Sequence, residues 1–239
     1  MYSTTAPVYR QQTNTGAVRA LVIILIAALG VFAIGGAMTL ADMTDSAFLG
    51  GLRQDQQTFD DASPASNAST PVSAWKKGET PFLYQRDPAW ENKAYAGETI
   101  GTSGCGPTCL SMIYVTLTGR TDYSPERMCA FSEAGGYIED GMTRWALLDE
   151  GASQLGLSSR IVPATPKSIE KELAQGHPII LSMGKGEFTD IGHFIVVTDL
   201  TSDGKLLIRD PNSPERTHVS WDAKRVCDQA RSAWAFSLK

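Results

Sequence analysis

The distribution of apolar and polar residues divides the chain of 239 residues into three regions that follow a short N-terminal tail. Residues 20–41 are almost all apolar and carry no charge, whereas residues 42–74 are mostly Asp, Gln, Ser, Thr, Ala and Asn. Aromatic and apolar residues return at Trp75 and recur to the end of the sequence. This pattern predicts a folded domain over residues 75–239, preceded by one hydrophobic helix and a polar linker.

The apolar run has 22 residues, and about 20 are enough for a helix to cross the hydrocarbon core of a bilayer. Arg10 and Arg19 precede it, whereas Asp42 and Asp45 follow it. Because positive residues favour the cytoplasmic side, the pattern predicts a single-pass protein of the cell membrane. The tail, residues 1–19, is then cytoplasmic and everything after the helix is extracytoplasmic.

A cleaved signal peptide is the alternative interpretation of the same run. The run is longer than the usual hydrophobic region of a signal peptide, and Thr39-Leu40-Ala41 matches a cleavage site poorly. We therefore expect an uncleaved signal-anchor helix. The polar residues 42–74 are typical of a disordered extracytoplasmic linker, and a flexible chain of about 35 residues has a root-mean-square reach of about 30 Å.

Within the domain, apolar spacing and turn residues predict helices first and strands afterwards. Glycine and proline mark the ends of several helices, and the apolar runs that follow are too short for helices. The expected helices cover 105–117, a short segment opened by Ser124-Pro125, 143–155, a segment from Thr165 to Gly176, and about 222–230. The expected strands cover 178–183, 193–198, 205–210 and 233–238.

A hairpin is the clearest local signal among the strands. The runs 193–198 and 205–210 are separated by Thr201-Ser202-Asp203-Gly204, which has the composition of a tight turn. The two strands should therefore be antiparallel neighbours. The whole order of elements predicts an α+β domain in which N-terminal helices pack on a C-terminal antiparallel sheet.

Composition narrows the possible partners. The formal net charge is −5 and the isoelectric point is about 5.2, so the chain lacks the basic surface of a nucleic-acid-binding protein. The histidines lack ligand spacing with one another, and the cysteines do not form a two-pair zinc pattern. We expect no metal and no cofactor.

Cys105 is the candidate nucleophile. It begins the helix opened by Gly104-Cys105-Gly106-Pro107, and a helix N-terminus stabilises a thiolate through its free N–H groups and its dipole. The two glycines allow a tight turn and the close approach of a substrate. Cys109 lies one helical turn later and should point into the core.

The chain offers three histidines as a base for this thiol. His177 lies between Gly176 and Pro178 and has the context of a loop or helix cap, while His218 follows a polar stretch and has the context of a surface residue. His193 begins a strand after Gly192, where another group can approach closely. His193 is therefore the predicted base.

Hairpin parity selects a partner for the histidine. If Thr201–Gly204 is a four-residue loop, Asp210 lies opposite Ile195 and diagonal to His193 on the same face. Asp199 and Asp203 lie too near the turn. The simpler account of Asp210-Pro211-Asn212 is a turn that follows a strand.

Gln85 is the candidate for the second oxyanion donor, beside the backbone N–H of Cys105. It lies in the segment that leads to the nucleophile, and the alternative is an exposed polar residue in a loop. Cys129 and Cys227 could form a disulfide in an exported protein, although two buried thiols account for them at least as well.

These motifs, taken together and in order, resemble the bacterial papain-like cysteine peptidases related to the double-glycine leader peptidases. The resemblance covers residues 80–239 and rests on four segments: Tyr84-Gln85-Arg86-Asp87-Pro88-Ala89-Trp90, residues 104–112 around Cys105, Gly192-His193-Phe194-Ile195-Val196-Val197, and Asp210-Pro211-Asn212. It implies a papain-like fold with Cys105 as nucleophile, His193 as general base and acid, Asp210 as its orienting partner and Gln85 as oxyanion donor. Gln85 lies twenty residues before Cys105, whereas the papain-like glutamine usually lies only a few residues before the nucleophile.

The predicted function is hydrolysis of a peptide or amide bond through a Cys-His-Asp triad and a thioester intermediate. The expected substrate is a peptide or a peptidoglycan peptide, and the expected membrane contact is made by the N-terminal helix. Two alternatives remain open: cleavage of a cell-wall amide, and a catalytically silent envelope domain that binds a peptide or partner on the same fold.

Overall fold

A six-stranded antiparallel sheet is the centre of the computed structural model, which describes residues 66–239. The expected tail, membrane helix and the linker as far as residue 65 lie outside the described residues. Among residues 66–239, no helix combines the length and the apolar composition that crossing a bilayer requires.

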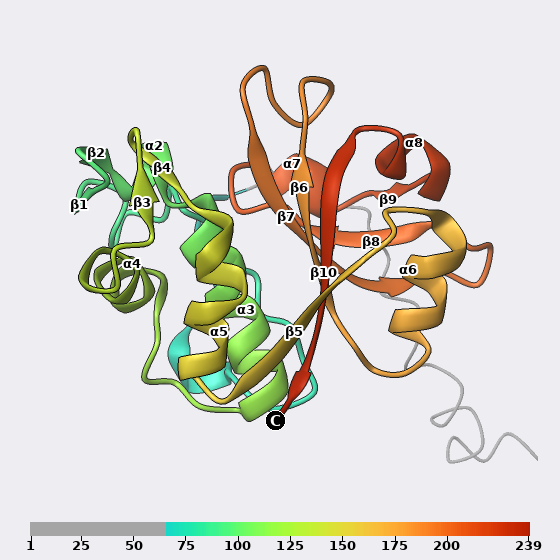
Figure 1. Ribbon diagram of the computed structural model, residues 1–239, viewed down its shortest axis with the longest axis horizontal. Coiled ribbons are helices and arrows are strands. Elements are labelled where there is room, and N and C mark those ends of the chain that lie inside the picture. The colour runs from blue at the N-terminus through green and yellow to red at the C-terminus, as the bar shows by residue number, and fades with distance from the viewer. Residues whose placement is uncertain (1–65) are drawn as a thin grey trace, which may run out of the picture. The chain divides into compact units, whose positions relative to one another are not determined.

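The sheet has the strand order β5-β10-β6-β7-β8-β9, and every neighbouring pair is antiparallel (Figure 1). The last strand in the chain therefore lies between two earlier ones. The strands are β5 (Leu157–Val162), β6 (Ile179–Met183), β7 (His193–Leu200), β8 (Leu206–Arg209), β9 (Ser220–Trp221) and β10 (Ala230–Leu238).

Alternation along the central strands gives the sheet two apolar faces. On one face, Ile180, Phe194 and Trp234 pack against α3 (Cys105–Thr118) in a common core. On the other face, Ile179 and Ile195 pack in a second core with residues of α6 (Pro166–Leu173) and α8 (Ala223–Cys227). Figure 1 shows α3 and α6 on opposite sides of the sheet, so the predicted packing of N-terminal helices on an antiparallel sheet is confirmed.

Most predicted helices are present, with the expected ends. Helix α3 ends at Gly119, which adopts φ +71°. The side chain of Ser124 accepts a hydrogen bond from the backbone N–H of Arg127 and so caps α4 (Pro125–Ala134). Thr165 caps α6 through the same kind of bond to Ser168.

The helix predicted over residues 143–155 is wrong. Thr143 belongs to a short hairpin of β3 (Ile138–Glu139) and β4 (Met142–Thr143), and the residues after it form a 3₁₀ helix, η3 (Trp145–Leu148), and α5 (Glu150–Gln154). Asp149 separates the two at φ −116° and ψ −80°, outside the helical range. The apolar spacing had indicated one continuous helix because both short segments place leucine or alanine on the same core.

The β7–β8 hairpin has the predicted pairing register near Asp210, although its turn differs from the predicted one. Leu200 pairs with Leu206, so the turn is one residue longer than predicted, and a bulge between Val197 and Asp199 shifts the register back. The two changes cancel, because Val196 lies opposite Arg209 and the next pair in that register is Ile195 with Asp210. The predicted placement of Asp210 is therefore correct although the predicted four-residue loop is wrong.

Several short elements were not predicted, because two to four residues carry no measurable periodicity. They are η2 (Val72–Ala74), β1 (Ala94–Tyr95), β2 (Glu98–Thr99), α2 (Ile100–Ser103), α7 (Pro214–Thr217) and the strands β3, β4 and β9 described above. Contacts with the domain also begin before the expected first residue, Trp75. The backbone N–H of Ser69 donates to Asp87, and that of Thr70 donates to the carbonyl of Phe82.

Candidate active site

Cys105 is the first residue of α3, as the sequence predicted, and its side chain is partly exposed. The adjacent glycines serve close packing. A Cβ atom on Gly104 would lie 2.5 Å from the carbonyl oxygen of Ile100, and one on Gly106 would lie 2.9 Å from Cγ2 of Thr143. Neither glycine has a positive φ. The sequence predicts that the two glycines permit a tight turn. In the structure they instead permit close packing of this segment against α2 and β4.

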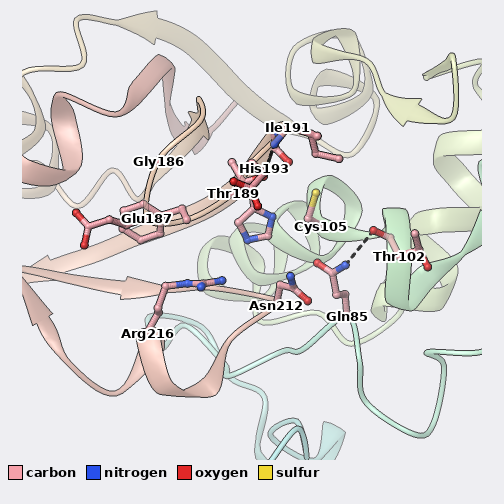
Figure 2. A pocket seen from close by; sticks show the side chains of 13 residues that line it. Gln85, Thr102, Cys105, Gly186, Glu187, Thr189, Ile191, His193, Asn212 and Arg216 are labelled. Atoms are coloured by element: carbon pink, nitrogen blue, oxygen red, sulfur yellow. Dashed lines mark hydrogen bonds between the residues drawn. The ribbon is translucent and has the colours of Figure 1, made fainter.

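His193 and Asp210 meet as hairpin parity predicted. His193 is the first residue of β7, Asp210 follows β8, and His193 Nε2 lies 2.7 Å from Asp210 Oδ1. Their side chains are 5% and 0% exposed. Because Nε2 faces the carboxylate, Nδ1 is the nitrogen that remains for Cys105. Figure 2 shows the imidazole ring beside the Cys105 sulfur.

The two buried groups shift each other's proton affinity. Burial by itself lowers the pKa of His193, but the hydrogen bond to Asp210 and the contact with Cys105 outweigh it and raise that pKa to about 9. Burial raises the pKa of Asp210, but the hydrogen bond and charge of His193, together with Arg216, lower it overall. The pair is therefore held as imidazolium and carboxylate at neutral pH.

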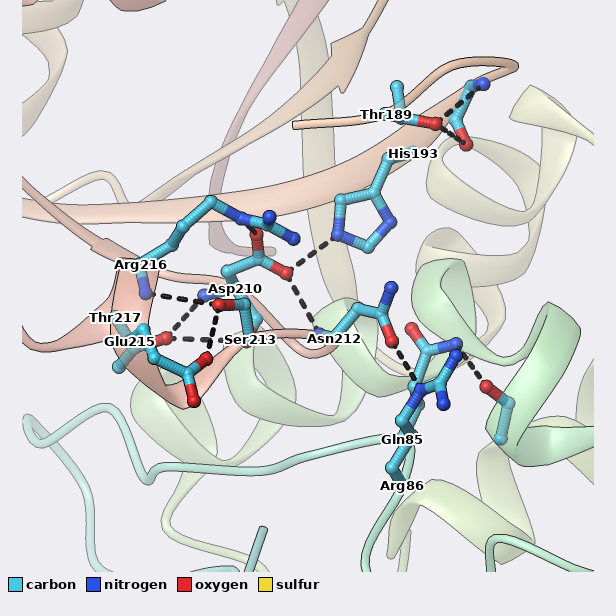
Figure 3. Close-up of polar contacts among 12 residues, drawn as sticks. Gln85, Arg86, Thr189, His193, Asp210, Asn212, Ser213, Glu215, Arg216 and Thr217 are labelled. Atoms are coloured by element: carbon cyan, nitrogen blue, oxygen red, sulfur yellow. Dashed lines mark hydrogen bonds and ion pairs between the residues drawn. The ribbon is translucent and has the colours of Figure 1, made fainter. Parts of the chain in front are cut away.

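Arg216 is a site residue that the sequence analysis missed. Its Nε donates to Asp210 Oδ2 at 2.6 Å, opposite the oxygen that His193 contacts (Figure 3). Arg216 lies on α7, whose N-terminus is capped by the Ser213 side chain. Thr217, the next residue, accepts a hydrogen bond at 2.8 Å from the backbone N–H of Asp210. Ser213-Pro214-Glu215, the helix-start pattern directly before Arg216, was the available signal, because it begins a turn of helix just after the strand that leads to Asp210.

Gln85 is buried at the site, with 2% of its surface exposed. Its Nε2 donates to the carbonyl oxygens of Gly101 at 2.9 Å and Thr102 at 3.4 Å, while its Oε1 has no hydrogen-bond partner among the described residues. The exposed loop position that the sequence left open for Gln85 is therefore excluded. Its backbone N–H donates to the carbonyl of Pro211 at 2.8 Å and so connects this segment to the residues after Asp210.

Two cavities border Cys105 and His193. The larger, of about 480 Å³, is bounded by Gln85, Asn212, Arg216 and the loop of residues 186–192 (Figure 2). The smaller, of about 300 Å³, has a mainly apolar wall that includes Met142, Trp145 and Phe194. The nucleophile thus lies between a polar and an apolar recess.

The other histidines and cysteines lie where the sequence placed them. His177 lies in the loop between α6 and β6 and bonds with Glu172, while His218 is exposed and stacks on Phe82 with ring centroids 5.3 Å apart. The four cysteines are free, so the possible disulfide of Cys129 with Cys227 is not formed and the alternative of two buried thiols is correct. Burial raises the pKa of Cys109 well above its usual value. Within residues 66–239, no cluster of His, Cys, Asp and Glu could hold a metal ion.

Comparison with known proteins agrees with this arrangement. Residues 78–236 match the model of the Peptidase_C39 like family. The chain belongs to this family. As a C39-like protein it has a papain-like, cysteine peptidase-like domain, which confirms the resemblance seen in the sequence.

Two solved structures are similar to this C39-like chain. The peptidase domain of Streptococcus ComA, described as a bifunctional ABC transporter involved in a quorum sensing pathway, is 21% identical with a TM-score of 0.46. That match covers 58% of this chain and 93% of the ComA domain. A putative C39-like peptidase from Bacillus anthracis is 13% identical with a TM-score of 0.40, covering 68% of this chain and 96% of its own. No curated protein matches the sequence.

Proposed function

We propose that this C39-like protein is a membrane-anchored, extracytoplasmic cysteine hydrolase that cleaves a peptide or amide bond. One observation carries the proposal: His193, bonded to the buried Asp210 at 2.7 Å, borders the same cavity as Cys105 at the start of α3. These are the parts that a thiol nucleophile, its base and an orienting carboxylate require.

In the proposed reaction, His193 Nδ1 already holds the proton of the Cys105 thiol, and Cys105 Sγ attacks the carbonyl carbon as a thiolate. The negative oxygen of the tetrahedral intermediate accepts hydrogen bonds from the backbone N–H of Cys105 and from Gln85 Nε2, whose bond to Thr102 is long at 3.4 Å. His193 then protonates the leaving amine and a thioester remains. Water, deprotonated by His193, hydrolyses the thioester, which releases the acid and restores the thiol.

Hydrolysis by Cys105 is tested by product profiles. The full chain and its Cys105→Ala variant are each incubated with libraries of peptides and of peptidoglycan fragments. Products that form only with the unsubstituted chain are expected, and the library that yields them separates proteolysis from cleavage of cell-wall peptides. Identical profiles would reject the enzyme and favour a silent binding domain on the same fold.

The proposed location rests on the apolar run 20–41 and the flanking arginines and aspartates. Protease added to intact cells that express the chain should remove the C-terminal domain, while the pelleted membranes retain an N-terminal fragment. Protection of the domain in intact cells would contradict the extracytoplasmic placement, and release of the whole chain without detergent would contradict the anchor.

A further inference from the structure

The guanidinium of Arg216 has donors that the proposed reaction does not use. Its Nε donates to Asp210 Oδ2 at 2.6 Å, which takes one of the five N–H groups of an arginine. The four N–H groups on its two Nη atoms meet no acceptor among residues 66–239. Arg216 belongs to the wall of the larger cavity, of about 480 Å³, which Cys105 also borders. Figure 2 shows the guanidinium extending into this cavity.

Asn212 adds another donor to the same wall. Arg86 Nε donates to Asn212 Oδ1 at 2.7 Å, and because a guanidinium has no acceptor, this bond leaves Asn212 Nδ2 for the cavity. Nδ2 forms no hydrogen bond with another described residue, and Figure 3 shows it directed toward the space below His193. The backbone N–H of Asn212 donates to Asp210 Oδ1 at 2.8 Å, which holds the amide next to the carboxylate that Arg216 contacts.

Two acidic residues also border the cavity, and neither occupies these donors. Glu187 Oε1 accepts from Arg225 Nε at 2.7 Å and from Gln229 Nε2 at 3.1 Å, so an arginine outside the cavity wall balances its charge. Asp190 is exposed, so water screens its charge. Arg216 is 26% exposed and is the one arginine or lysine among the described residues that form this wall.

We propose that the Nη atoms of Arg216 and Nδ2 of Asn212 bind a carboxylate of the substrate close to the bond that Cys105 cleaves. A planar carboxylate accepts hydrogen bonds on both oxygens and carries the charge that a guanidinium complements, whereas an amide carbonyl offers one uncharged oxygen. The inference rests on the proposed function and narrows the substrate from peptides in general to peptides with an acidic group beside the cleaved bond. That group is either the end of the chain, as in the substrate of an exopeptidase, or an acidic side chain.

Labelling of Cys105 by three iodoacetyl compounds tests the carboxylate site. N-iodoacetyl-asparagine has a free carboxylate at the chain end, its isomer N-iodoacetyl-isoasparagine has one on the side chain, and N-iodoacetyl-asparagine amide is neutral. In each reaction the Cys105 sulfur displaces iodide, so a C–S bond forms as the C–I bond breaks, and the thiol proton stays on His193. The rates are measured with the full chain at pH 7 and low salt, and each is divided by the rate of the same compound with 2-mercaptoethanol, an uncharged thiol.

At least one acid should label Cys105 about tenfold faster than the neutral compound, the change that one charge-assisted hydrogen bond supports. The isomer that is preferred identifies the source of the carboxylate as the chain end or the side chain. The same three compounds built on glutamine, which is one methylene longer, cover a longer distance from the sulfur.

Arg216→Lys separates binding of a carboxylate from support of Asp210. A lysine supplies a cation for Asp210 but has a single ammonium, so the spare Nη donors are lost. The ratio of acid to neutral rates should fall about fivefold. Because any change in the reactivity of Cys105 affects both rates, their ratio reports the carboxylate alone. Asn212→Ala should lower the ratio about threefold, and it serves as the second variant if the lysine variant fails to fold.

Two further variants serve as controls. Arg160→Lys changes an arginine that bonds with Glu172 in a cluster outside this cavity, so it should leave the ratio unaltered. Asp190→Asn removes a negative charge from the cavity wall and should raise the ratio about twofold.

Ratios within twofold of one for every acid, or a preference for an acid that Arg216→Lys and Asn212→Ala leave unchanged, would overturn the carboxylate site. Failure of the proposed function gives a different result. If Cys105 is not an activated nucleophile, the neutral compounds will label it no faster than they label 2-mercaptoethanol, whereas loss of the carboxylate site alone leaves that labelling fast.

Discussion

The described part of the chain contains two clusters in which one carboxylate bonds with both a histidine and an arginine. In the first, Asp210 bonds with His193 and Arg216, and in the second, Glu172 bonds with His177 and Arg160. The polar groups alone do not distinguish them.

Burial and the neighbouring cavity distinguish the clusters. The side chain of His193 is 5% exposed and borders a cavity with Cys105, whereas that of His177 is 25% exposed and borders another cavity of about 440 Å³. No cysteine is among the described residues that form the wall of this second cavity. A histidine paired with a carboxylate becomes a candidate base only where the fold places a nucleophile beside it. Among the described residues, the start of α3 places Cys105 beside His193 and not beside His177.

The largest expected difference between the clusters is in thiol reactivity. His193→Gln should slow alkylation of Cys105 by iodoacetamide at pH 7 by about a hundredfold, since general-base assistance contributes about 10²–10⁴. His177→Gln should leave the rate within twofold. Mass spectrometry of the labelled protein gives both rates and also separates Cys105 from the buried Cys109, which should remain unlabelled while the chain is folded. If both substitutions slowed the alkylation of Cys105 to a similar extent, His193 could not be distinguished from His177 as its base.

Removing the charge of Asp210 should lower the free energy of unfolding more than removing the charge of Glu172. Asp210→Asn is expected to lower the free energy of unfolding by about 3 kcal/mol. The substitution removes the buried negative charge that balances the charges of His193 and Arg216. Glu172→Gln should cost about 1 kcal/mol, because Arg160 is 52% exposed and water can replace the lost bond. Denaturant titration of both variants measures the difference, and a larger loss for Glu172→Gln would reverse our ranking of the two sites.

The dependence of stability on pH should sharpen the same comparison. The pKa of His193 is raised to about 9, so its favourable contribution is complete below about pH 6.5 and is lost as the pH rises through 9. The free energy of unfolding should therefore fall over this range, by at most about 1.4 kcal/mol for each pH unit. His193→Gln should flatten the profile and His177→Gln should not. An unchanged slope in His193→Gln would show that another group binds the proton.

The smallest expected effect concerns Gly106, which permits the contact of α3 with Thr143. A Cβ atom there would lie 2.9 Å from a methyl group that can move only slightly, so Gly106→Ala should cost about 1 kcal/mol of stability. Thr143→Ser removes that methyl group but keeps the Cβ and Oγ1 atoms, which would lie 3.1 and 3.2 Å from the added Cβ, so the double variant should recover part of the loss in a thermal melt. No recovery would mean that Gly106 is required for another reason.

The sequence predicted the parts of the site that depend on regular structure. Cys105 was placed by a helix start with proline in the first turn, and His193 with Asp210 by the alternation of a hairpin. The hairpin prediction succeeded because two deviations cancel, and nothing in the local sequence shows that a bulge near Thr198 compensates for a longer turn.

The other features of the site depend on contacts between residues far apart in the sequence, which local sequence patterns do not reveal. Arg216 and the orientation of Gln85 are determined by α7 and α2, two helices of four residues each, which are too short to show periodicity. The helix predicted over residues 143–155 is absent because Thr143 pairs with Ile138 in a hairpin and the chain leaves helical geometry at Asp149. The Thr143 hydroxyl also hydrogen-bonds with Tyr95, 48 residues away, which no local pattern shows. The membrane helix stays a prediction.

The position of β10 in the sheet has a consequence for synthesis. This strand follows all the others in the chain, yet it lies between β5 and β6 and pairs with both. While the ribosome still holds residues 230–238, β5 has no partner strand, and it cannot be joined to the strands β6 to β9. The domain should therefore fold only after its last strand has been released, so a truncated product that lacks this strand should go to degradation and display no working site.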